Sequence, residues 1–381
     1  MGRDSAQESL AMPPVPIMLV SHLLDTGGSE RQMRQLAVAL DRSRWDVHVA
    51  FFRPEPDRER ELNAAGVNTV FIPVYSYTSI DTVRSVMKLR RYLKDHKIQL
   101  LHAFDNPSST FAVPVARLAG VPVALASQRS NRKLEAIRLQ RLRRFVDPCA
   151  HGFVVNAKAL EEHLVKDEGI ARNKIHFCPN GLDTSRFSME GRKRLPELAS
   201  ASLVIGCIAW HRPEKQIPFL VDAFAEMRRM RPGLQLVLVG SGTETASVVA
   251  RVDAHKLGSD CLMIPHTPDT SDILKSIDIF ILASKSEGAS NSVMEAMASG
   301  CAVLASNVEG TRDLVQNGSN GFLFEYLDQA SLLEKVLPLI DNPTLRVKMG
   351  TDSSHWVRST MSLEAATARM ASIYEQYLAH K

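Results

Sequence analysis

The strongest constraint on the fold is the alternation of short apolar runs with amphipathic segments along nearly the whole chain. The runs are rich in β-branched residues, as expected for strands buried on both faces of a parallel sheet, and the segments between them are long enough for helical crossovers. Seven runs precede residue 180: 16–21, 45–52, 68–73, 99–104, 121–127, 151–156 and 174–179. Six runs follow residue 202: 203–209, 234–240, 261–265, 277–284, 301–306 and 321–325.

The two sets of runs predict two doubly wound, Rossmann-like α/β domains, residues 14–180 and residues 203–360. Between them, residues 181–202 are rich in charge and small side chains without a clear period, so we expect a hinge there. The segment 361–381 follows a completed sheet and is expected to return toward the first domain as a crossover helix. Residues 1–13 are interpreted as a disordered lead-in.

Composition limits the class of protein. No stretch approaches the roughly 18 apolar residues of a membrane span, and the polar start does not resemble a signal peptide, so we expect a cytoplasmic protein. The five cysteines are odd in number and widely scattered, which favours reduced, buried thiols over disulfides or a metal site. We expect no bound metal, no cofactor and no nucleic-acid partner.

The basic residues are concentrated in the first half of the chain. Residues 1–180 contain 26 Lys and Arg against 19 Asp and Glu, although the net charge of the whole chain is only +4. The excess gathers in residues 84–97 and 129–145, which both have leucine-type residues at helical spacing. Such segments are either solvated helix faces or contacts to an anionic membrane surface or phosphorylated acceptor. The arginines concerned in the second segment are Arg138, Arg141, Arg143 and Arg144.

In open α/β sheets ligands bind at the carboxyl ends of the strands, and two such domains facing one another form a cleft. One stretch after a predicted strand, SEGASNSVMEAMASG at residues 286–300, holds two glutamates eight positions apart, Glu287 and Glu295. Glu295 with Ser292 has the spacing of a capping box, which is a purely structural interpretation. Glu287 has no such role. The alternative is that both carboxylates accept hydrogen bonds from a polyhydroxylated ligand.

Other motifs also follow predicted strands. Gly27 and Gly28 precede a predicted helix start, where free backbone amides favour an anion, although a plain turn explains them equally well. Arg212 and Lys215 follow the first strand of the second domain and suit a diphosphate, although loop cations are usually only solvated. The turn at residues 240–245 lacks the third glycine of a dinucleotide fingerprint.

From about residue 16 to residue 380 the chain resembles the family 4 glycosyltransferases, which have the two-domain GT-B fold. The matching motifs are GGSE at 27–30, NGLD at 180–183, PEK at 213–215, EGASNSVMEAMASG at 287–300 and VEGTRDLVQNGSNGFLF at 308–324, with Phe187 after the second of them. The glutamate pair is the most specific of these signatures.

The resemblance implies a role for each motif. Glu287 would approach the hydroxyls of the donor sugar, and Glu295 would bind the ribose hydroxyls of the nucleotide. Amides of Gly28 would complete the diphosphate site. Either Pro265 or His266 would lie near the base. The donor sugar and diphosphate would meet the backbone of Gly288, Ala289, Ser290, Asn291 and Ser292.

Retention of anomeric configuration without a metal is also implied, with Lys215 stabilising the leaving diphosphate. This sequence departs from the family pattern at two places. Trp210 stands where an arginine is expected, so Arg212 is the predicted substitute. Gln128, Arg129 and Ser130 occupy the site of a histidine that faces the reacting carbon in many members, and His102 and Asp105 are the nearest alternatives.

The favoured function is a retaining hexosyltransferase that moves a sugar from a nucleoside diphosphate donor to a saccharide or lipid-linked acceptor. Its expected role is cell-envelope or extracellular polysaccharide synthesis, with a peripheral position at the cytoplasmic membrane face. Two alternatives stay open: a nucleotide-sugar-binding protein that has lost catalysis, and a nucleotide-sugar epimerase of the same fold.

Overall fold

The computed structural model describes residues 13–24, 27–77, 79–129, 132, 137–242, 245–265, 267 and 269–379, with the backbone alone at residues 137–139. Of the predicted lead-in, residues 1–12 lie outside this description. The chain forms two compact units. The first comprises Met1–Ser127, Ala136–Phe153 and Ala371–Lys381, and the second comprises Gln128–Glu135 and Val154–Met370.

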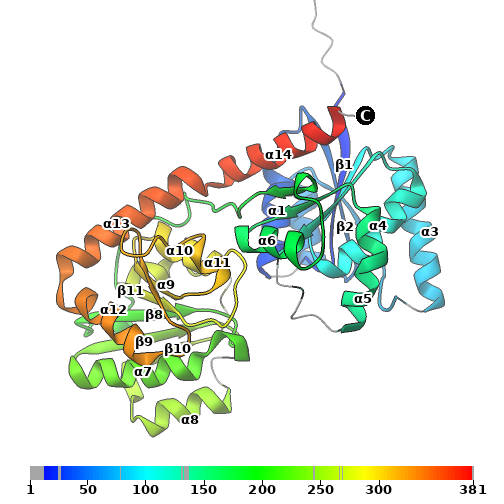
Figure 1. The fold of residues 1–381 in the computed structure, drawn as a ribbon. Coiled ribbons are helices and arrows are strands. Elements are labelled where there is room, and N and C mark those ends of the chain that lie inside the picture. The colour runs from blue at the N-terminus through cyan, green and yellow to red at the C-terminus, as the bar shows by residue number, and fades with distance from the viewer. Residues whose placement is uncertain are drawn as a thin grey trace, which may run out of the picture. The chain divides into compact units, whose positions relative to one another are not determined.

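Seven strands form the first sheet, in the order β3-β2-β1-β4-β5-β6-β7 (Figure 1). Parallel pairing joins β3, β2, β1, β4 and β5, and Leu19 of β1 lies opposite Val49 of β2 and His102 of β4. The elements are β1 (Val15–Ser21), α1 (Gly28–Ala39), β2 (Trp45–Phe51), α2 (Pro56–Ala64), β3 (Asn68–Phe71), α3 (Ile80–Asp95), β4 (Leu100–Ala103), α4 (Asn106–Ala119), β5 (Val123–Gln128), α5 (Ile137–Val146), β6 (Gly152–Val155), α6 (Lys158–Lys166) and β7 (Ile175–Phe177).

Six parallel strands form the second sheet, in the order β10-β9-β8-β11-β12-β13. Every residue of β8, β9, β11 and β12 is buried, which explains their continuous apolar sequence. The elements are β8 (Leu203–Ile208), α7 (Ile217–Met230), β9 (Leu234–Val239), α8 (Ala246–Ala254), β10 (Cys261–Ile264), α9 (Ser271–Ser276), β11 (Ile279–Leu282), α10 (Asn291–Ala298), β12 (Ala302–Ser306), α11 (Glu309–Arg312), β13 (Phe322–Phe324), α12 (Gln329–Asp341), α13 (Pro343–Thr360) and α14 (Leu363–Ala379).

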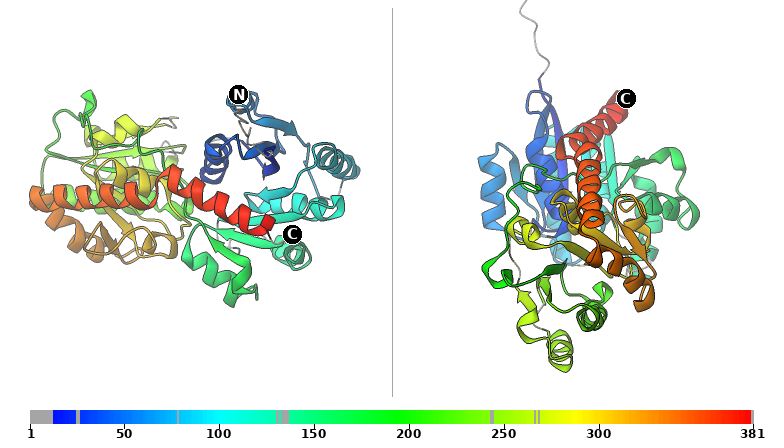
Figure 2. Two further views of the ribbon diagram at one scale, coloured as in Figure 1. Left: turned by 90° about the horizontal axis from the view of Figure 1, so that it is seen from above. Right: turned by 90° about the vertical axis from the view of Figure 1, so that its left-hand side faces the viewer.

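Both predicted sheets are therefore confirmed, since one strand overlaps each apolar run. Helices separate successive strands in both sheets, and Figure 2 shows them around the sheets from two further sides. The predicted domain limits at 180 and 203 stay a prediction. The sheets divide the chain between β7 and β8, whereas the compact units place residues 154–180 with the second sheet.

The C-terminal helix α14 ends within the first unit, as predicted for a returning helix. Tyr374 is fully buried there, and its ring meets the Trp45 ring edge-on at 5.9 Å between centroids. Aromatic pairs of this geometry add to the free energy gained by burial. Tyr374 of α14 thus forms part of the first unit's core.

Local sequence signals set the start of α4 and the end of α10. Asp105 caps α4 by accepting from the Ser108 amide at 2.7 Å, while the Ser108 hydroxyl accepts from the Asp105 amide at 3.2 Å. The predicted stop of α10 is confirmed, because Gly300 adopts φ +75° directly after the C-cap.

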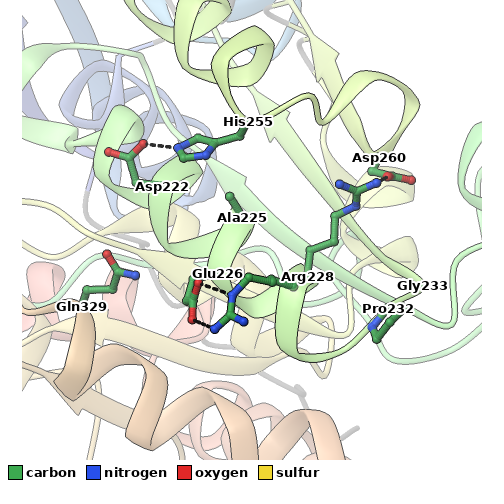
Figure 3. A pocket seen from close by; sticks show the side chains of 10 residues that line it. Asp222, Ala225, Glu226, Arg228, Pro232, Gly233, His255, Asp260 and Gln329 are labelled. Atoms are coloured by element: carbon green, nitrogen blue, oxygen red, sulfur yellow. Dashed lines mark hydrogen bonds and ion pairs between the residues drawn. The ribbon is translucent and has the colours of Figure 1, made fainter.

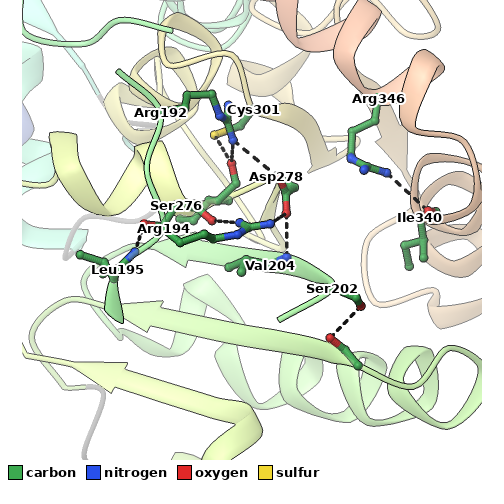
Figure 4. A network of polar contacts seen from close by, with 12 residues as sticks. Arg192, Arg194, Leu195, Ser202, Val204, Ser276, Asp278, Cys301, Ile340 and Arg346 are labelled. Atoms are coloured by element: carbon green, nitrogen blue, oxygen red, sulfur yellow. Dashed lines mark hydrogen bonds and ion pairs between the residues drawn. The ribbon is translucent and has the colours of Figure 1, made fainter. Parts of the chain in front are cut away.

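Part of the predicted hinge is fixed to the second sheet (Figure 4). Arg192 donates to the carbonyls of Ser299 and Gly300 at 3.0 Å, and Arg194 binds the Asp278 carboxylate at 2.5 Å. The same carboxylate accepts from the Val204 amide at 2.8 Å. Residues 192–194 are therefore anchored near the amino ends of β8 and β11.

Candidate functional site

The loop before α10 carries the first glutamate of the predicted pair. Ser290 is the N-cap residue of α10, with an extended backbone and no side-chain cap hydrogen bond. Ser292 is the second residue inside the helix, so its hydroxyl is not placed to cap the helix. The capping box of Ser292 and Glu295 is therefore wrong, and the structural interpretation of the glutamate pair loses its basis.

Glu287 is paired with a lysine from the loop after β8. Lys215 ends the short 3-10 helix Pro213–Lys215, and its Nζ lies 2.5 Å from the Glu287 Oε1. The exposed fractions of the two side chains are 21% and 9%. A backbone hydrogen bond of 2.7 Å from the Lys285 amide to the Glu214 carbonyl joins the same two loops. The structure thus brings together two residues that were predicted to be catalytic.

Glu295 lies in the second turn of α10 and is 3% exposed. Thr270, just before α9, places its hydroxyl 3.5 Å from the Glu295 Oε2. The first amides of a helix lack intrahelical acceptors, and those of α10 belong to the predicted donor-binding residues Asn291 and Ser292. Carboxylate oxygens and the first amides of a helix therefore occur together at this end of α10.

Two glycines allow backbone segments to approach the loop closely. A Cβ on Gly288 would lie 2.6 Å from the Arg129 carbonyl oxygen. A Cβ on Gly310, in α11, would lie 1.8 Å from the Gly288 carbonyl oxygen. Both distances are far below van der Waals contact, so the loop is held between two other segments that a larger residue would displace.

A network of polar side chains that the sequence did not reveal surrounds this loop. Asn180 accepts from Arg129 at 2.9 Å and from Asn156 at 3.1 Å, and it donates to the Ala289 carbonyl at 3.0 Å and to the Asn291 side chain at 2.8 Å. Arg129, Asn156 and Asn180 follow the ends of β5, β6 and β7. The sequence signal that could have identified this network is a polar residue shortly after each of these three strands.

Arg212 lies beside Trp210, the residue that replaces the expected arginine. Its guanidinium carbon is 4.0 Å from the centroid of the Trp210 ring, which is a cation–π arrangement, and Trp210 is 56% exposed. Arg212 is three residues before Lys215 in the same loop. The predicted substitution of Arg212 for the missing arginine stays a prediction.

The prediction of a catalytic His102 is not supported. His102 is fully buried, and its Nδ1 and Nε2 lie 2.8 Å from the Tyr374 hydroxyl and 2.9 Å from the Ser127 hydroxyl. A ring engaged on both nitrogens inside the core cannot reach a substrate. Asp105, the other alternative, has one carboxylate oxygen on the Ser108 amide and the other 2.7 Å from the His22 amide.

The remaining predicted site residues are placed separately. Gly27 is the N-cap residue of α1 and Gly28 is its first residue, both in the first unit. His266 lies outside the described residues, and Pro265 follows β10. No group of three or more His, Cys, Asp or Glu that would suit a metal ion occurs in the described part of the chain.

The basic segment 129–145 differs from its prediction at one position. Arg143 is 3% exposed and therefore does not present its charge at the surface. Arg141 and Arg144 are exposed beside Phe145, which is 78% exposed, and the Arg138 side chain lies outside the described residues. Over the described residues, none of the helices combines the length and apolarity needed to span a membrane.

A cavity of about 690 Å³ lies elsewhere on the second unit, beside α7 (Figure 3). Its charged side chains are mostly paired with one another: Asp222 with His255 at 2.7 Å, and Glu226 with Arg229 at 2.6 Å. None of the predicted site residues lines it.

Comparisons with known proteins identify the family of this chain. Residues 26–186 match the family described as Glycosyltransferase Family 4, and residues 194–356 match Glycosyl transferases group 1. The Escherichia coli UDP-Gal:alpha-D-GlcNAc-diphosphoundecaprenol alpha-1,3-galactosyltransferase is 24% identical over 74% of this chain and 77% of its own length. The Staphylococcus aureus capsular polysaccharide biosynthesis glycosyltransferase CapM is 23% identical over 94% and 97%.

A solved structure shows the same fold. Anabaena Alr3699/HepE, in complex with UDP and glucose, matches 95% of this chain and 100% of its own with a TM-score of 0.83 and 15% sequence identity. The two sequence matches together cover the second sheet, the first sheet except β1, and the loop and helix that carry Glu287 and Glu295. The chain belongs to the family 4 glycosyltransferases of the GT-B fold and is an enzyme of that class.

Proposed function

We propose that this glycosyltransferase moves a sugar from a nucleoside diphosphate donor to a saccharide or lipid-linked acceptor, with retention of configuration and without a bound metal. The observation that carries the proposal is the contact of 2.5 Å between Lys215 and Glu287 at the loop before α10. A cation, a carboxylate and a helix N-terminus in one place match a ligand that contains both phosphates and hydroxyls.

The Lys215–Glu287 pair suggests how a donor is received. The diphosphate of an incoming donor attracts Lys215, and the Glu287 carboxylate then becomes available to the hydroxyls of the sugar. Glu295, which is buried in the next turn, accepts from the ribose hydroxyls. Charge-assisted hydrogen bonds of this kind are the stronger class, so each exchange compensates for the contact it replaces.

During transfer the bond from the sugar C1 to the diphosphate oxygen breaks, and a bond from C1 to the acceptor oxygen forms on the same face. The acceptor hydroxyl proton passes to the leaving diphosphate. Negative charge grows on the diphosphate as its bond to C1 breaks, and Lys215 with the α10 amides stabilises that charge. In this scheme the diphosphate serves as the base, which fits a His102 ring that is fully occupied within the core.

The relatives support the substrate classes. The name of the E. coli relative specifies a UDP-linked galactose donor and an acceptor on undecaprenyl diphosphate, and that of the S. aureus relative specifies capsular polysaccharide. We therefore place the enzyme in cell-envelope or extracellular polysaccharide synthesis, at the cytoplasmic face of the membrane.

A surface stripe on α3 supports membrane association better than the basic segment that follows β5. Ile80, Val83 and Met87 are 79%, 57% and 66% exposed. Their spacing places them on one side of the helix, and we call them the α3 stripe. Arg91 and Lys94 are exposed on the same helix. Apolar insertion with flanking cations is the chemistry of binding to anionic lipid.

The test is a donor screen followed by a transfer assay. Purified protein is mixed with UDP-galactose, UDP-glucose or GDP-mannose, and protection from thermal unfolding identifies the donor. Release of the nucleoside diphosphate with a polyprenyl diphosphate-linked sugar then measures transfer, with and without EDTA, and the anomeric configuration of the product is read by NMR. An inverted product or loss of activity in EDTA would overturn the corresponding part of the proposal.

Trp210 favours one second candidate, a nucleotide-sugar-binding protein without transfer. The ring occupies the position of the expected arginine and holds the Arg212 guanidinium at 4.0 Å. Thermal protection by a donor, without any release of nucleotide across the acceptor series, is the result that selects this candidate.

A further inference from the structure

Asn180 is the centre of the polar network around the loop before α10, and it is 4% exposed. Its amide group can accept two hydrogen bonds and donate two. All four are made: Arg129 and Asn156 donate to Oδ1, and Nδ2 donates to the Ala289 carbonyl and the Asn291 Oδ1. Asn180 is therefore saturated, and no other side chain of its size supplies the same four contacts.

The chemistry of the partners fixes which end of the amide faces which side. Arginine only donates, so the oxygen of Asn180 faces Arg129. A backbone carbonyl only accepts, so the nitrogen of Asn180 faces Ala289. One end of the side chain thus holds residues that follow β5 and β6, and the other end holds the loop that precedes α10.

We infer that Asn180 is a positioning residue for the donor: it holds the backbone of residues 289–291 in the arrangement that receives the sugar and the diphosphate. The inference rests on the proposed function of that loop. Glycines with tight surroundings keep the neighbouring segments close, since a Cβ on Gly288 would lie 2.6 Å from the Arg129 carbonyl. These close contacts do not fix the direction of the Ala289 carbonyl. Asn180 fixes it by donating a hydrogen bond of 3.0 Å to the carbonyl oxygen.

Asn180→Asp is the sharpest variant, because it preserves size and both acceptor contacts and replaces the two donations to the loop with a charged oxygen that only accepts. Asn320→Asp is the matched control. Asn320 is 2% exposed in the same unit, its Oδ1 accepts from the Gln316 amide at 2.7 Å, and its Nδ2 donates to the Leu314 carbonyl at 3.1 Å. The control loses the same kind of bond without touching the loop before α10.

We expect Asn180→Asp to lower kcat/KM for the donor by about tenfold to a hundredfold, as two lost hydrogen bonds imply. The KM for the acceptor should stay unchanged. Binding of the nucleoside monophosphate, UMP or GMP, should fall less than binding of the whole UDP-galactose, UDP-glucose or GDP-mannose. The control variant should keep wild-type kinetics, although it lowers the unfolding temperature by a similar amount.

A second variant, Asn291→Ala, removes the other partner of one of the two bonds. Because that bond is shared, its effect on donor kcat/KM should be less than additive with that of Asn180→Asp. Wild-type donor kinetics in a folded Asn180→Asp variant, or equal losses for the monophosphate and the whole donor, would overturn the inference alone. A wild-type protein that binds none of the three donors would overturn the proposed function and the inference with it.

Discussion

The Nζ of Lys215 lies 2.5 Å from the Oε1 of Glu287, so the cation and the carboxylate that the proposed reaction uses are paired with each other. Glu287 is 9% exposed, and a carboxylate so little hydrated depends on its partner for stabilisation. The two residues are therefore coupled, and a substitution of either one changes the electrostatic environment of the other.

This coupling makes a first prediction. Glu287→Gln should abolish most transfer while leaving affinity for the nucleoside diphosphate nearly unchanged, because it removes sugar contacts and no ribose contact. Lys215→Ala should lower kcat more than donor affinity, because charge on the diphosphate grows as the bond to C1 breaks. The double variant should lose less than the sum, by about 0.5–3 kcal/mol of coupling. Steady-state kinetics and calorimetric binding measure both quantities, and equal losses of nucleotide binding in Glu287→Gln would contradict the assignment.

The second prediction separates the nucleotide site from the helix start. Glu295→Gln should weaken nucleoside diphosphate binding by about 1.5–3 kcal/mol, the range for hydrogen bonds to a charged group. Ser292→Ala should change the free energy of unfolding by no more than about 0.5 kcal/mol, because Ser292 lies inside α10 and caps nothing. If Ser292→Ala lowers the free energy of unfolding by about 1 kcal/mol or more, the hydroxyl of Ser292 does cap the helix and the structural interpretation returns.

The third prediction concerns the buried His102. Tyr374→Phe removes one hydrogen bond of 2.8 Å and should lower the free energy of unfolding by about 0.5–1.5 kcal/mol. His102→Leu leaves the hydroxyls of Tyr374 and Ser127 without this partner and should cost about 1–3 kcal/mol for each group left unsatisfied. Urea unfolding measures both. The kcat per folded molecule should match the wild type in both variants, and a hundredfold fall in kcat at unchanged stability would return His102 to the catalytic residues.

These cases show what the sequence could and could not predict. Each strand could be predicted because burial on both faces requires a continuous apolar run. The end of α10 could be predicted because Gly300 is a glycine, the residue that most readily adopts the positive φ found there. The side-chain partners were not visible. Whether Glu295 caps a helix depends on the exact first residue of α10, and whether His102 reaches substrate depends on Tyr374, 272 residues away. The role of Asn180 likewise follows from contacts 109 and 111 residues distant.

The fourth prediction follows from His211, close to Lys215 in sequence. Burial lowers the pKa of His211 from its ordinary 6.5 to about 4. Between these values the unfolded chain binds a proton that the folded chain does not, so stability is lost as the pH falls from 6.5 toward 4. His211→Asn should make the unfolding temperature less dependent on pH in this window, whereas the exposed His355 in α13 provides a control variant, His355→Asn. Identical pH slopes for wild type and His211→Asn would show that His211 does not contribute.

The last prediction tests the membrane surface. The α3 stripe should hold the protein on liposomes that contain phosphatidylserine, and rising salt should release it, because surface cations contribute only about 1 kcal/mol each and are screened. Changing Ile80, Val83 and Met87 together to Gln should abolish sedimentation with these liposomes and slow transfer to a lipid-linked acceptor. Val347→Gln, at a residue 62% exposed in the second unit, is the control and should leave both unchanged. Changing Arg141 and Arg144 to Gln tests whether α5 contributes to liposome binding. Liposome binding that survives the α3 change and fails with the α5 change would move the membrane surface to α5, and binding that survives both would remove it from the first unit.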